Sequence, residues 1–198
     1  MSFWDERYRG DTYAYGTEPN DFLKSEVARI PKGRVLCLAE GEGRNAVFLA
    51  GLGYEVTAVD LSLEGLRKAE RLARARGVTL QVQQADLTTY EPAAAAFTGI
   101  VAIFAHLPAP SRRRLLGLVP GALVAGGVFL LECYRPEQLA FATGGPKDRA
   151  LLPTLAELRD ELAPLDLVVA RDVEREIHEG TFHDGPSATV QIIGKKRA

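Results

Sequence analysis

The chain has 198 residues, a length that suits a single α/β domain. Apolar residues make up 46% of it and charged residues 25%, which excludes a disordered or fibrous protein. The net charge of −2 argues against a protein that coats nucleic acid, and two cysteines are too few for a disulfide framework. No basic segment followed by an apolar one opens the chain, so we expect no secretory signal and a cytoplasmic protein.

Two stretches without charged residues, 93–111 and 115–131, are long enough to raise the question of a membrane span. The first contains His106, Pro108 and Pro110, and the second contains Pro120 and four glycines. These residues divide each stretch into pieces of the length of a strand or a short helix. We therefore expect buried strands with their connections, and no membrane partner.

Strands and helices alternate along most of the chain. A short helix over Asp21–Arg29 comes first, and Ser62 and Gly77 are the expected N-cap and stop of a longer one. The predicted strands are Arg34–Ala39, Glu55–Asp60, Val78–Gln84, Ile100–Ala105 and Val128–Tyr134, and the remaining predicted helices are Arg44–Leu52 and Ser111–Leu118. Short strands that alternate with helices form βαβ units, so the predicted fold class is α/β with a doubly wound, mostly parallel sheet.

The C-terminal part breaks this alternation. Thr154 and Glu157 form a predicted capping box, which opens a helix to about Leu162. Leu167–Glu176 and Thr189–Lys195 follow with no helical pattern between them, which predicts an antiparallel pair and a seven-stranded sheet with an antiparallel last strand. We expect one domain over 1–198, with an N-terminal cap (1–33), a cofactor-binding core (34–134), and a third part (135–198). That third part contains a lid loop over 135–152, a helix and the terminal hairpin.

The two cysteines fall on the first and fifth predicted strands. With the strand order 3-2-1-4-5, one strand separates Cys37 from Cys133, so the two residues lie roughly 10 Å apart. That separation is too large for a disulfide bond. We expect both to be small core residues.

Charged residues on two predicted helices are expected to face solvent. Glu64 with Lys68 and Glu70 with Arg74 have the i,i+4 spacing of surface ion pairs. Arg112–Arg114 lies at the start of a helix, where positive charge is unfavourable, so an anion site is not expected there.

A glycine-rich turn follows the first predicted strand, and acidic residues follow the next two. Gly41 and Gly43 allow a sharp turn and a close approach of the backbone to a ligand. Asp60 ends the second strand, where an acid accepts hydrogen bonds from both ribose hydroxyls of an adenosine, and Asp86 after the third strand is placed to meet adenine. With Ala46, the turn also satisfies the dinucleotide fingerprint, so a nicotinamide-dependent oxidoreductase stays open as an alternative.

The run Val35–Ala46 resembles motif I of class I S-adenosylmethionine-dependent methyltransferases, which reads hydrophobic–D/E–x–G–x–G–x–G. Gly41 and Gly43 match this pattern, whereas Cys37 stands in place of the acid and Ala39 in place of the first glycine. In the family the acid helps to orient the methionine end of the cofactor. The resemblance therefore implies that this contact is altered here.

The resemblance extends over nearly the whole chain. The segments Phe3–Asn20 and Phe104–Leu107 are similar to those of small methyltransferases related to tellurite-resistance and thiopurine-type enzymes. It implies an enzyme that moves a methyl group from S-adenosylmethionine to a small-molecule acceptor, with S-adenosylhomocysteine as product. The alternatives are an NAD(P)-dependent oxidoreductase and a protein that binds S-adenosylmethionine without catalysis. We expect a monomer or homodimer that binds no nucleic acid.

Specific site residues follow from this resemblance. The expected cofactor-binding residues are Tyr15, Ala39, Glu40, Gly41, Gly43, Asn45, Asp60, Leu61, Asp86, Leu87 and Phe104. His106 and His183 are candidates for a general base if the acceptor must lose a proton. The spacing of the histidines matches no metal motif, so no metal is expected.

Overall fold

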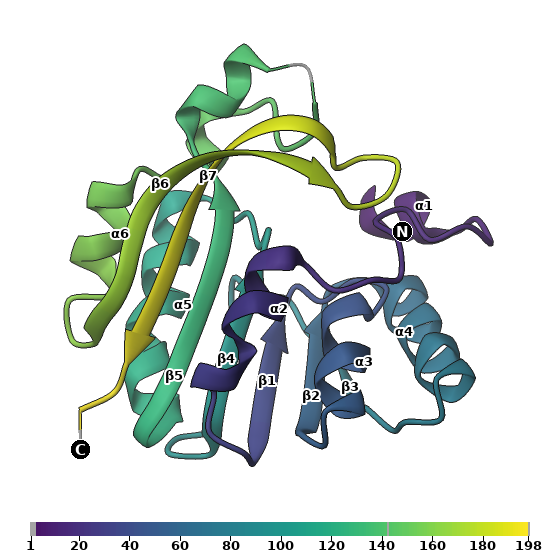
Figure 1. Ribbon diagram of the computed structural model, residues 1–198, viewed down its shortest axis with the longest axis horizontal. Coiled ribbons are helices and arrows are strands. Elements are labelled where there is room, and N and C mark those ends of the chain that lie inside the picture. The colour runs from purple at the N-terminus through teal and green to yellow at the C-terminus, as the bar shows by residue number, and fades with distance from the viewer. Residues whose placement is uncertain (1–2, 142, 198) are drawn as a thin grey trace.

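The computed structural model describes residues 3–141 and 143–197. It contains a seven-stranded sheet in the order β3-β2-β1-β4-β5-β7-β6 (Figure 1). The strands are β1 (Arg34–Leu38), β2 (Glu55–Asp60), β3 (Gln81–Gln84), β4 (Phe97–Ile103), β5 (Leu123–Tyr134), β6 (Asp166–His178) and β7 (Asp184–Lys195). Strands β1 to β5 pair in parallel, and β7 is antiparallel to both β5 and β6. The predicted fold class, including the antiparallel last strand, is confirmed.

Helices cover both faces of the sheet (Figure 1). The helices are α1 (Phe3–Tyr8), α2 (Asp21–Glu26), α3 (Arg44–Gly51), α4 (Leu63–Ala75), α5 (Ala109–Ala122) and α6 (Leu155–Glu161), with 3₁₀ turns η1 (Val27–Arg29), η2 (Pro136–Ala140) and η3 (Arg149–Leu151). Alternate residues of β1 divide the core, because successive strand side chains point to opposite faces. Val35 and Cys37 pack with α2, α3 and α4, whereas Leu36 and Leu38 pack with α5 and α6. Cys37 and Cys133 are free and buried, on strands that β4 separates, as expected.

Local capping signals are found where the sequence predicts them. The Ser62 hydroxyl accepts a hydrogen bond from the Gly65 N–H at 3.1 Å, and both bonds of the Thr154–Glu157 capping box are present. Helix α5 runs to Ala122, past the expected end at Leu118, even though it contains Pro120. Its buried residues Leu115, Leu116, Val119 and Ala122 maintain a helical period. Packing of this face against the sheet therefore outweighs the loss of one helical hydrogen bond.

The expected surface positions of two basic residues are wrong. Lys68 is 1% exposed, and its ammonium contacts the Glu42 carboxylate and the backbone carbonyls of Gly10 and Thr12. The N-terminal segment, through Gly10 and Thr12, covers this face of α4. The helical periodicity alone therefore placed Lys68 at the surface. Arg112 is likewise buried, and it donates two hydrogen bonds to Glu161 of α6 at 2.8 and 3.0 Å.

The hairpin of β6 and β7 is longer than the sequence predicts. It arches over the carboxyl ends of the parallel strands, and its loop reaches the N-terminal segment near α1 (Figure 1). There the Thr181 N–H donates to the Ala14 carbonyl at 3.0 Å. The predicted lid contains η2, η3 and the turn between them, except for residue 142, which lies outside the described residues.

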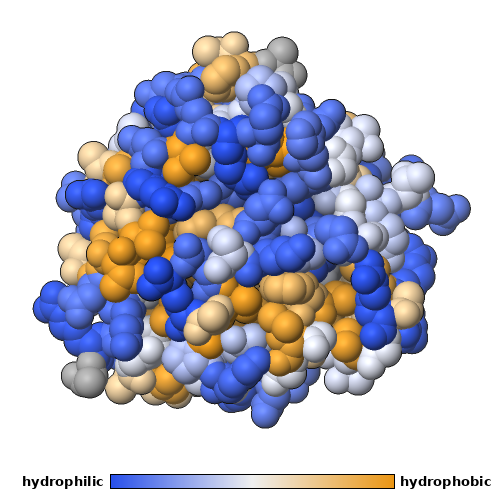
Figure 2. Space-filling view, in the orientation of Figure 1, coloured by the Kyte–Doolittle hydropathy of each residue, from blue (hydrophilic) through white to orange (hydrophobic). Residues whose placement is uncertain are grey.

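On the face of the molecule that Figure 2 shows, small patches of hydrophobic residues lie between hydrophilic ones. Within residues 3–141 and 143–197, no helix has the length and apolar character needed to cross a bilayer.

Candidate functional site

A cavity of about 910 Å³ lies at the carboxyl ends of the parallel strands. Residues 3–16 of the N-terminal segment and residues 181–184 of the hairpin line its outer side, and we call these two segments the roof. This volume falls within the range of small-molecule sites, and open α/β sheets bind ligands at this edge. Segments from three parts of the chain, residues 3–16, 143–147 and 181–184, contribute to its lining. The predicted site residues that line it are Tyr15, Ala39, Glu40, Asn45, Asp60, Leu61, Asp86, Leu87, Phe104, His106 and His183.

Gly41 and Gly43 lie behind the cavity wall. A Cβ atom on Gly43 would lie 2.5 Å from the Cβ of Ala69 in α4, and one on Gly41 would lie 2.7 Å from the Tyr8 hydroxyl. Both glycines have positive φ angles, +60° and +92°, which side chains rarely adopt. These conformations serve a tight turn and close helix packing, and neither glycine lines the cavity. A backbone contact of Gly41 or Gly43 with the ligand stays a prediction.

Ala39 adopts a backbone conformation that glycine adopts more easily. Its φ is +52°, and Phe104, at the end of β4, has a φ of +53°. Such conformations carry a cost of about 1–2 kcal/mol for residues with a Cβ atom. Strained residues of this kind cluster at functional sites, and both of these line the cavity.

The two aspartates at the strand ends differ in environment. Asp60 is 6% exposed and accepts hydrogen bonds from the Gly41 and Ser62 N–H groups, both at 2.8 Å. Burial raises its pKa, and these N–H groups act in the opposite direction. Asp86 is exposed, and the Thr88 N–H bonded to it lowers its pKa. Asp60 is therefore a fixed, oriented carboxyl group, whereas Asp86 lies at a solvated edge of the cavity.

Three charged residues of the turn after β1 are buried. Glu40 accepts a hydrogen bond from the Ala46 N–H at 2.8 Å, and burial raises its pKa to about 7. Glu42 is paired with Lys68. Arg44 approaches Glu179 at 2.6 Å through Nη2, while its buried Nη1 has no hydrogen-bond partner among the described residues.

A buried polar network connects this turn to the hairpin, and sequence reasoning missed it. Glu132 in β5 has no exposed surface and accepts two hydrogen bonds from Arg175 of β6, at 3.0 and 2.8 Å. The Asn20 side chain donates to Glu132 and to Glu179 at 2.6 and 2.9 Å. Since Arg44 also pairs with Glu179, the network joins the N-terminal segment, α3, β5 and the hairpin. Its members come from distant parts of the chain, so no local motif marks them.

The two candidate histidines are buried beside aromatic rings. His106 Nδ1 lies 3.3 Å from the Leu151 carbonyl oxygen, which only accepts, so Nδ1 carries the proton and Nε2 the lone pair. That Nε2 is buried and has no partner among the described residues, and burial lowers the His106 pKa to about 4. The His183 ring centroid lies 4.4 Å from that of Phe104 and 4.5 Å from that of Tyr15. Burial and, next, the charge of nearby Arg44 lower its pKa well below the usual value.

Aromatic and basic side chains from the N-terminal segment and the hairpin loop meet in the roof. The Arg7 guanidinium lies 3.9 Å from the ring centroid of Phe182 and donates to the Tyr15 hydroxyl at 3.3 Å. The Tyr15 N–H donates to Glu42 at 3.3 Å. These contacts therefore connect the two segments of the roof to each other, and they connect the N-terminal segment to the turn after β1.

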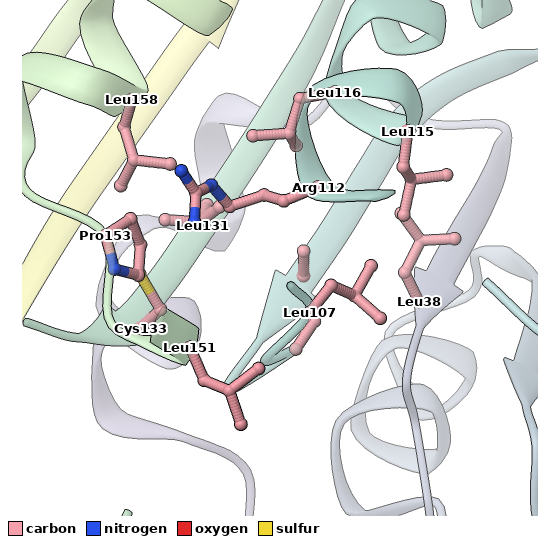
Figure 3. A pocket seen from close by; sticks show the side chains of 12 residues that line it. Leu38, Leu107, Arg112, Leu115, Leu116, Leu131, Cys133, Leu151, Pro153 and Leu158 are labelled. Carbon is pink, nitrogen blue, oxygen red and sulfur yellow. The ribbon is translucent and has the colours of Figure 1, made fainter. Parts of the chain in front are cut away.

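A second, much smaller cavity of about 20 Å³ lies between β4, β5, α5 and α6. Figure 3 shows that its walls are mostly apolar and that the Arg112 side chain extends from α5 toward Leu158 of α6. Burial raises the pKa of the Cys133 thiol in its wall far above the ordinary value. The volume is enough for about one water molecule, so this is a packing space.

Comparison with known proteins relates the cavity-bearing core to one family. Residues 35–127 match the family model described as "Methyltransferase domain". A protein-L-isoaspartate O-methyltransferase from Chlorobium phaeobacteroides is 37% identical over 75 residues, which are 38% of this chain. The match covers 35% of that enzyme, so the chain corresponds to about a third of its length.

Solved structures share the fold over most of the chain. A structure from work on the conversion of a disulfide bond into a thioacetal group during echinomycin biosynthesis has a TM-score of 0.75, is 21% identical, and the match covers 98% of this chain and 91% of that one. For TehB from Haemophilus influenzae the TM-score is 0.73 at 15% identity, over 98% of this chain and 66% of that one. An S-adenosylmethionine-dependent methyltransferase from Methanosarcina mazei has a TM-score of 0.71 at 18% sequence identity, and the match covers 91% of this chain and 99% of that one.

Proposed function

Because the chain contains a class I, S-adenosylmethionine-dependent methyltransferase domain, we propose that it transfers the methyl group of S-adenosylmethionine to a small-molecule acceptor. The observation that carries the proposal is one cavity that brings together the oriented carboxyl group of Asp60 and His106, whose Nε2 has no hydrogen-bond partner in the described part of the chain. The roof over this cavity supports an acceptor of small size.

The residues at the strand ends fit the adenosine part of the cosubstrate. The backbone N–H groups of Gly41 and Ser62 fix the orientation of the Asp60 carboxylate. Asp60 ends β2, and an acid at this position of the fold binds ribose hydroxyls. Leu61 and Leu87 offer apolar surface for a purine, and Asp86 is an acceptor for its amino group. When bound, S-adenosylmethionine supplies a methyl group on a sulfonium, already activated for displacement. The protein then has to align the acceptor and exclude water.

His106 is our candidate for the general base. Its Nε2 carries the lone pair, and this atom takes the proton that a protic acceptor loses as its heavy atom forms the new bond to carbon. The bond between carbon and sulfur breaks, and its electron pair stays on sulfur, which gives S-adenosylhomocysteine. With a pKa of about 4, His106 is neutral at pH 7 but a weak base. This favours acceptors whose proton is itself fairly acidic. His183 is the second candidate.

Calorimetry and a turnover assay test the proposal. We expect S-adenosylmethionine and S-adenosylhomocysteine to bind, NADH not to bind, and S-adenosylhomocysteine to form with at least one member of a panel of small thiols, phenols, acids and amines. Asp60→Ala should weaken binding roughly tenfold or more, because it removes a charge-assisted acceptor. Binding without turnover across the panel would favour a non-catalytic binding protein, and binding of NADH alone would favour an oxidoreductase.

A further inference from the structure

The order of the strands locates the part of the ligand that the aspartates do not reach. If adenosine lies over β3 and β2, the rest of the cosubstrate extends over the neighbouring strands β1 and β4. The turn after β1 presents two buried residues of opposite charge to the cavity there, Glu40 and Arg44. This step rests on the proposed function, since it assumes the same ligand.

Glu40 is a buried carboxyl group with no basic partner in an ion pair among the described residues. Its neighbour Glu42, two positions later, is paired with Lys68, and that pairing satisfies its charge. Glu40 has backbone N–H partners at the start of α3, and the charge of Arg44 acts on it from a greater distance. A buried carboxylate without a paired cation is costly, so a ligand cation at this position stabilises it.

Arg44 is the complementary group. Its side chain is 7% exposed, and one guanidinium nitrogen, Nη2, pairs with Glu179. The other, Nη1, is buried and has no hydrogen-bond partner among the described residues. Buried donors without partners are rare in folded proteins, and a ligand carboxylate satisfies a guanidinium nitrogen well.

Cys37, in contrast, has no access to the ligand. It occupies the motif position at which the family has an acid, but it is fully buried in the core between β1 and α3 and does not line the cavity. Position 37 therefore cannot supply a ligand contact in this fold, and an acid at the methionine end would have to come from another position.

We propose that Glu40 and Arg44 together bind the amino-acid end of S-adenosylmethionine, Glu40 its α-ammonium group and Arg44 its α-carboxylate. The function of the acid missing at position 37 is thereby transferred to the turn three residues later. Methylated and demethylated forms of the cosubstrate both carry this zwitterion, whereas 5′-methylthioadenosine carries the same adenosine without it. The pair thus selects ligands that contain an amino acid.

Calorimetry with S-adenosylhomocysteine and 5′-methylthioadenosine tests the assignment. We expect Glu40→Gln and Arg44→Met each to weaken S-adenosylhomocysteine about tenfold or more, and to leave 5′-methylthioadenosine within about twofold of the wild type. Asp60→Asn is the matched comparison, because it should weaken both ligands. Equal weakening of both ligands by Glu40→Gln, or no weakening of either, would overturn the assignment.

Two further measurements separate a binding role from a structural one. Glu179→Gln removes the ion-pair partner of Arg44 but keeps both proposed binding groups, so S-adenosylhomocysteine should still bind within a few-fold of wild type. If Arg44→Met fails to fold, Arg44→Lys replaces it. A selective loss of S-adenosylhomocysteine is expected, because the single ammonium nitrogen of lysine cannot pair with Glu179 and the ligand carboxylate in the forked geometry of a guanidinium. A wild-type protein that binds neither ligand contradicts the proposed function itself, before any variant is compared.

Discussion

Glu40 shows how one buried carboxyl group couples stability to pH. Its pKa is raised from 4.5 to about 7, chiefly by burial, with Asp60 of β2 adding to the rise and Arg44 of α3 opposing it. The Cys37 thiol of β1 also hydrogen-bonds to it. A folded-state pKa above the unfolded one means that the folded protein binds more protons between these values. Stability of the ligand-free protein therefore falls as pH rises from 4.5 through about 7.

We predict that Glu40→Gln stabilises the ligand-free protein at pH 8 and has little effect at pH 5. A shift of this size corresponds to about 3 kcal/mol as an upper limit. Urea unfolding at the two pH values measures it. Glu42→Gln is the control, because it leaves the buried Lys68 without its partner and should destabilise the protein at pH 8. The same effect of Glu40→Gln at both pH values would contradict the titration of Glu40 in this range.

We predict that His106→Asn lowers kcat by about 10²–10⁴-fold, the usual contribution of a general base. Binding of S-adenosylhomocysteine should not change. Because the pKa of His106 is about 4, its titration should leave kcat flat between pH 6 and 8. His178 is an exposed histidine bonded to Asp184, so His178→Asn serves as the control with unchanged kcat. Normal turnover by His106→Asn would transfer the base role to His183 or remove it.

At the scale of elements, the contact between α3 and α4 depends on Gly43. Its φ is +92°, and an added Cβ atom would lie 2.6 Å from the Ala69 Cα. We predict that Gly43→Ala destabilises the protein by the cost of the backbone conformation, about 1–2 kcal/mol, plus about 1–3 kcal/mol of overpacking. Gly77 has a similar φ of +69°, but a Cβ atom added there would have no atom of the described residues within 4 Å, so Gly77→Ala should show only the first cost. Equal losses of unfolding free energy in the two variants would contradict the packing role.

Elements governed by local rules were predictable from the sequence, and those governed by distant contacts were not. The caps at Ser62 and Thr154 depend on residues three positions away, so the sequence locates them. The outer part of the hairpin was not predicted, because polar and charged residues there replace the apolar alternation of a strand. Helix α1 was also missed, because its six residues are too few to show a helical period and they mix aromatic with charged side chains.

The same distinction applies to the site. Asp60 and Asp86 were found because the end of a strand can be read from its own sequence, and both line the cavity. The contact of Glu132 with Arg175 joins residues 43 positions apart, on β5 and β6, which both pair with β7 and not with each other. No local pattern encodes it. Lys68 was misplaced for a related reason: the segment that covers it, around Gly10 and Thr12, is 56 to 58 residues away.

At the scale of the whole molecule, the roof joins segments from both ends of the chain. The N-terminal segment and the hairpin loop are connected by the hydrogen bond from Thr181 to Ala14 and by the contact of Arg7 with Phe182. Gly180 lies against the backbone of Tyr15 and Gly16. A ligand below such a roof contacts all its segments, and ordering of one segment is expected to order the next.

We predict that amide exchange in residues 8–20, 135–152 and 179–184 slows together when S-adenosylhomocysteine binds, with Tyr15 among the protected positions.

Gly180→Ala tests whether this protection depends on the contact between the N-terminal segment and the hairpin loop. An added Cβ atom would lie 2.5 Å from the Gly16 nitrogen and from the Tyr15 carbonyl carbon, so the loop has to move away from the N-terminal segment. Protection of residues 8–20 should then be reduced and the KM for S-adenosylmethionine raised. Gly53→Ala is the control for backbone strain alone, because Gly53 has a φ of +85° and an added Cβ atom would meet no atom within 4 Å in the part of the chain that is described. Exchange rates that do not respond to saturating ligand would show instead that these segments are ordinary surface loops, and protection in Gly180→Ala equal to wild type would show that the two ends close independently.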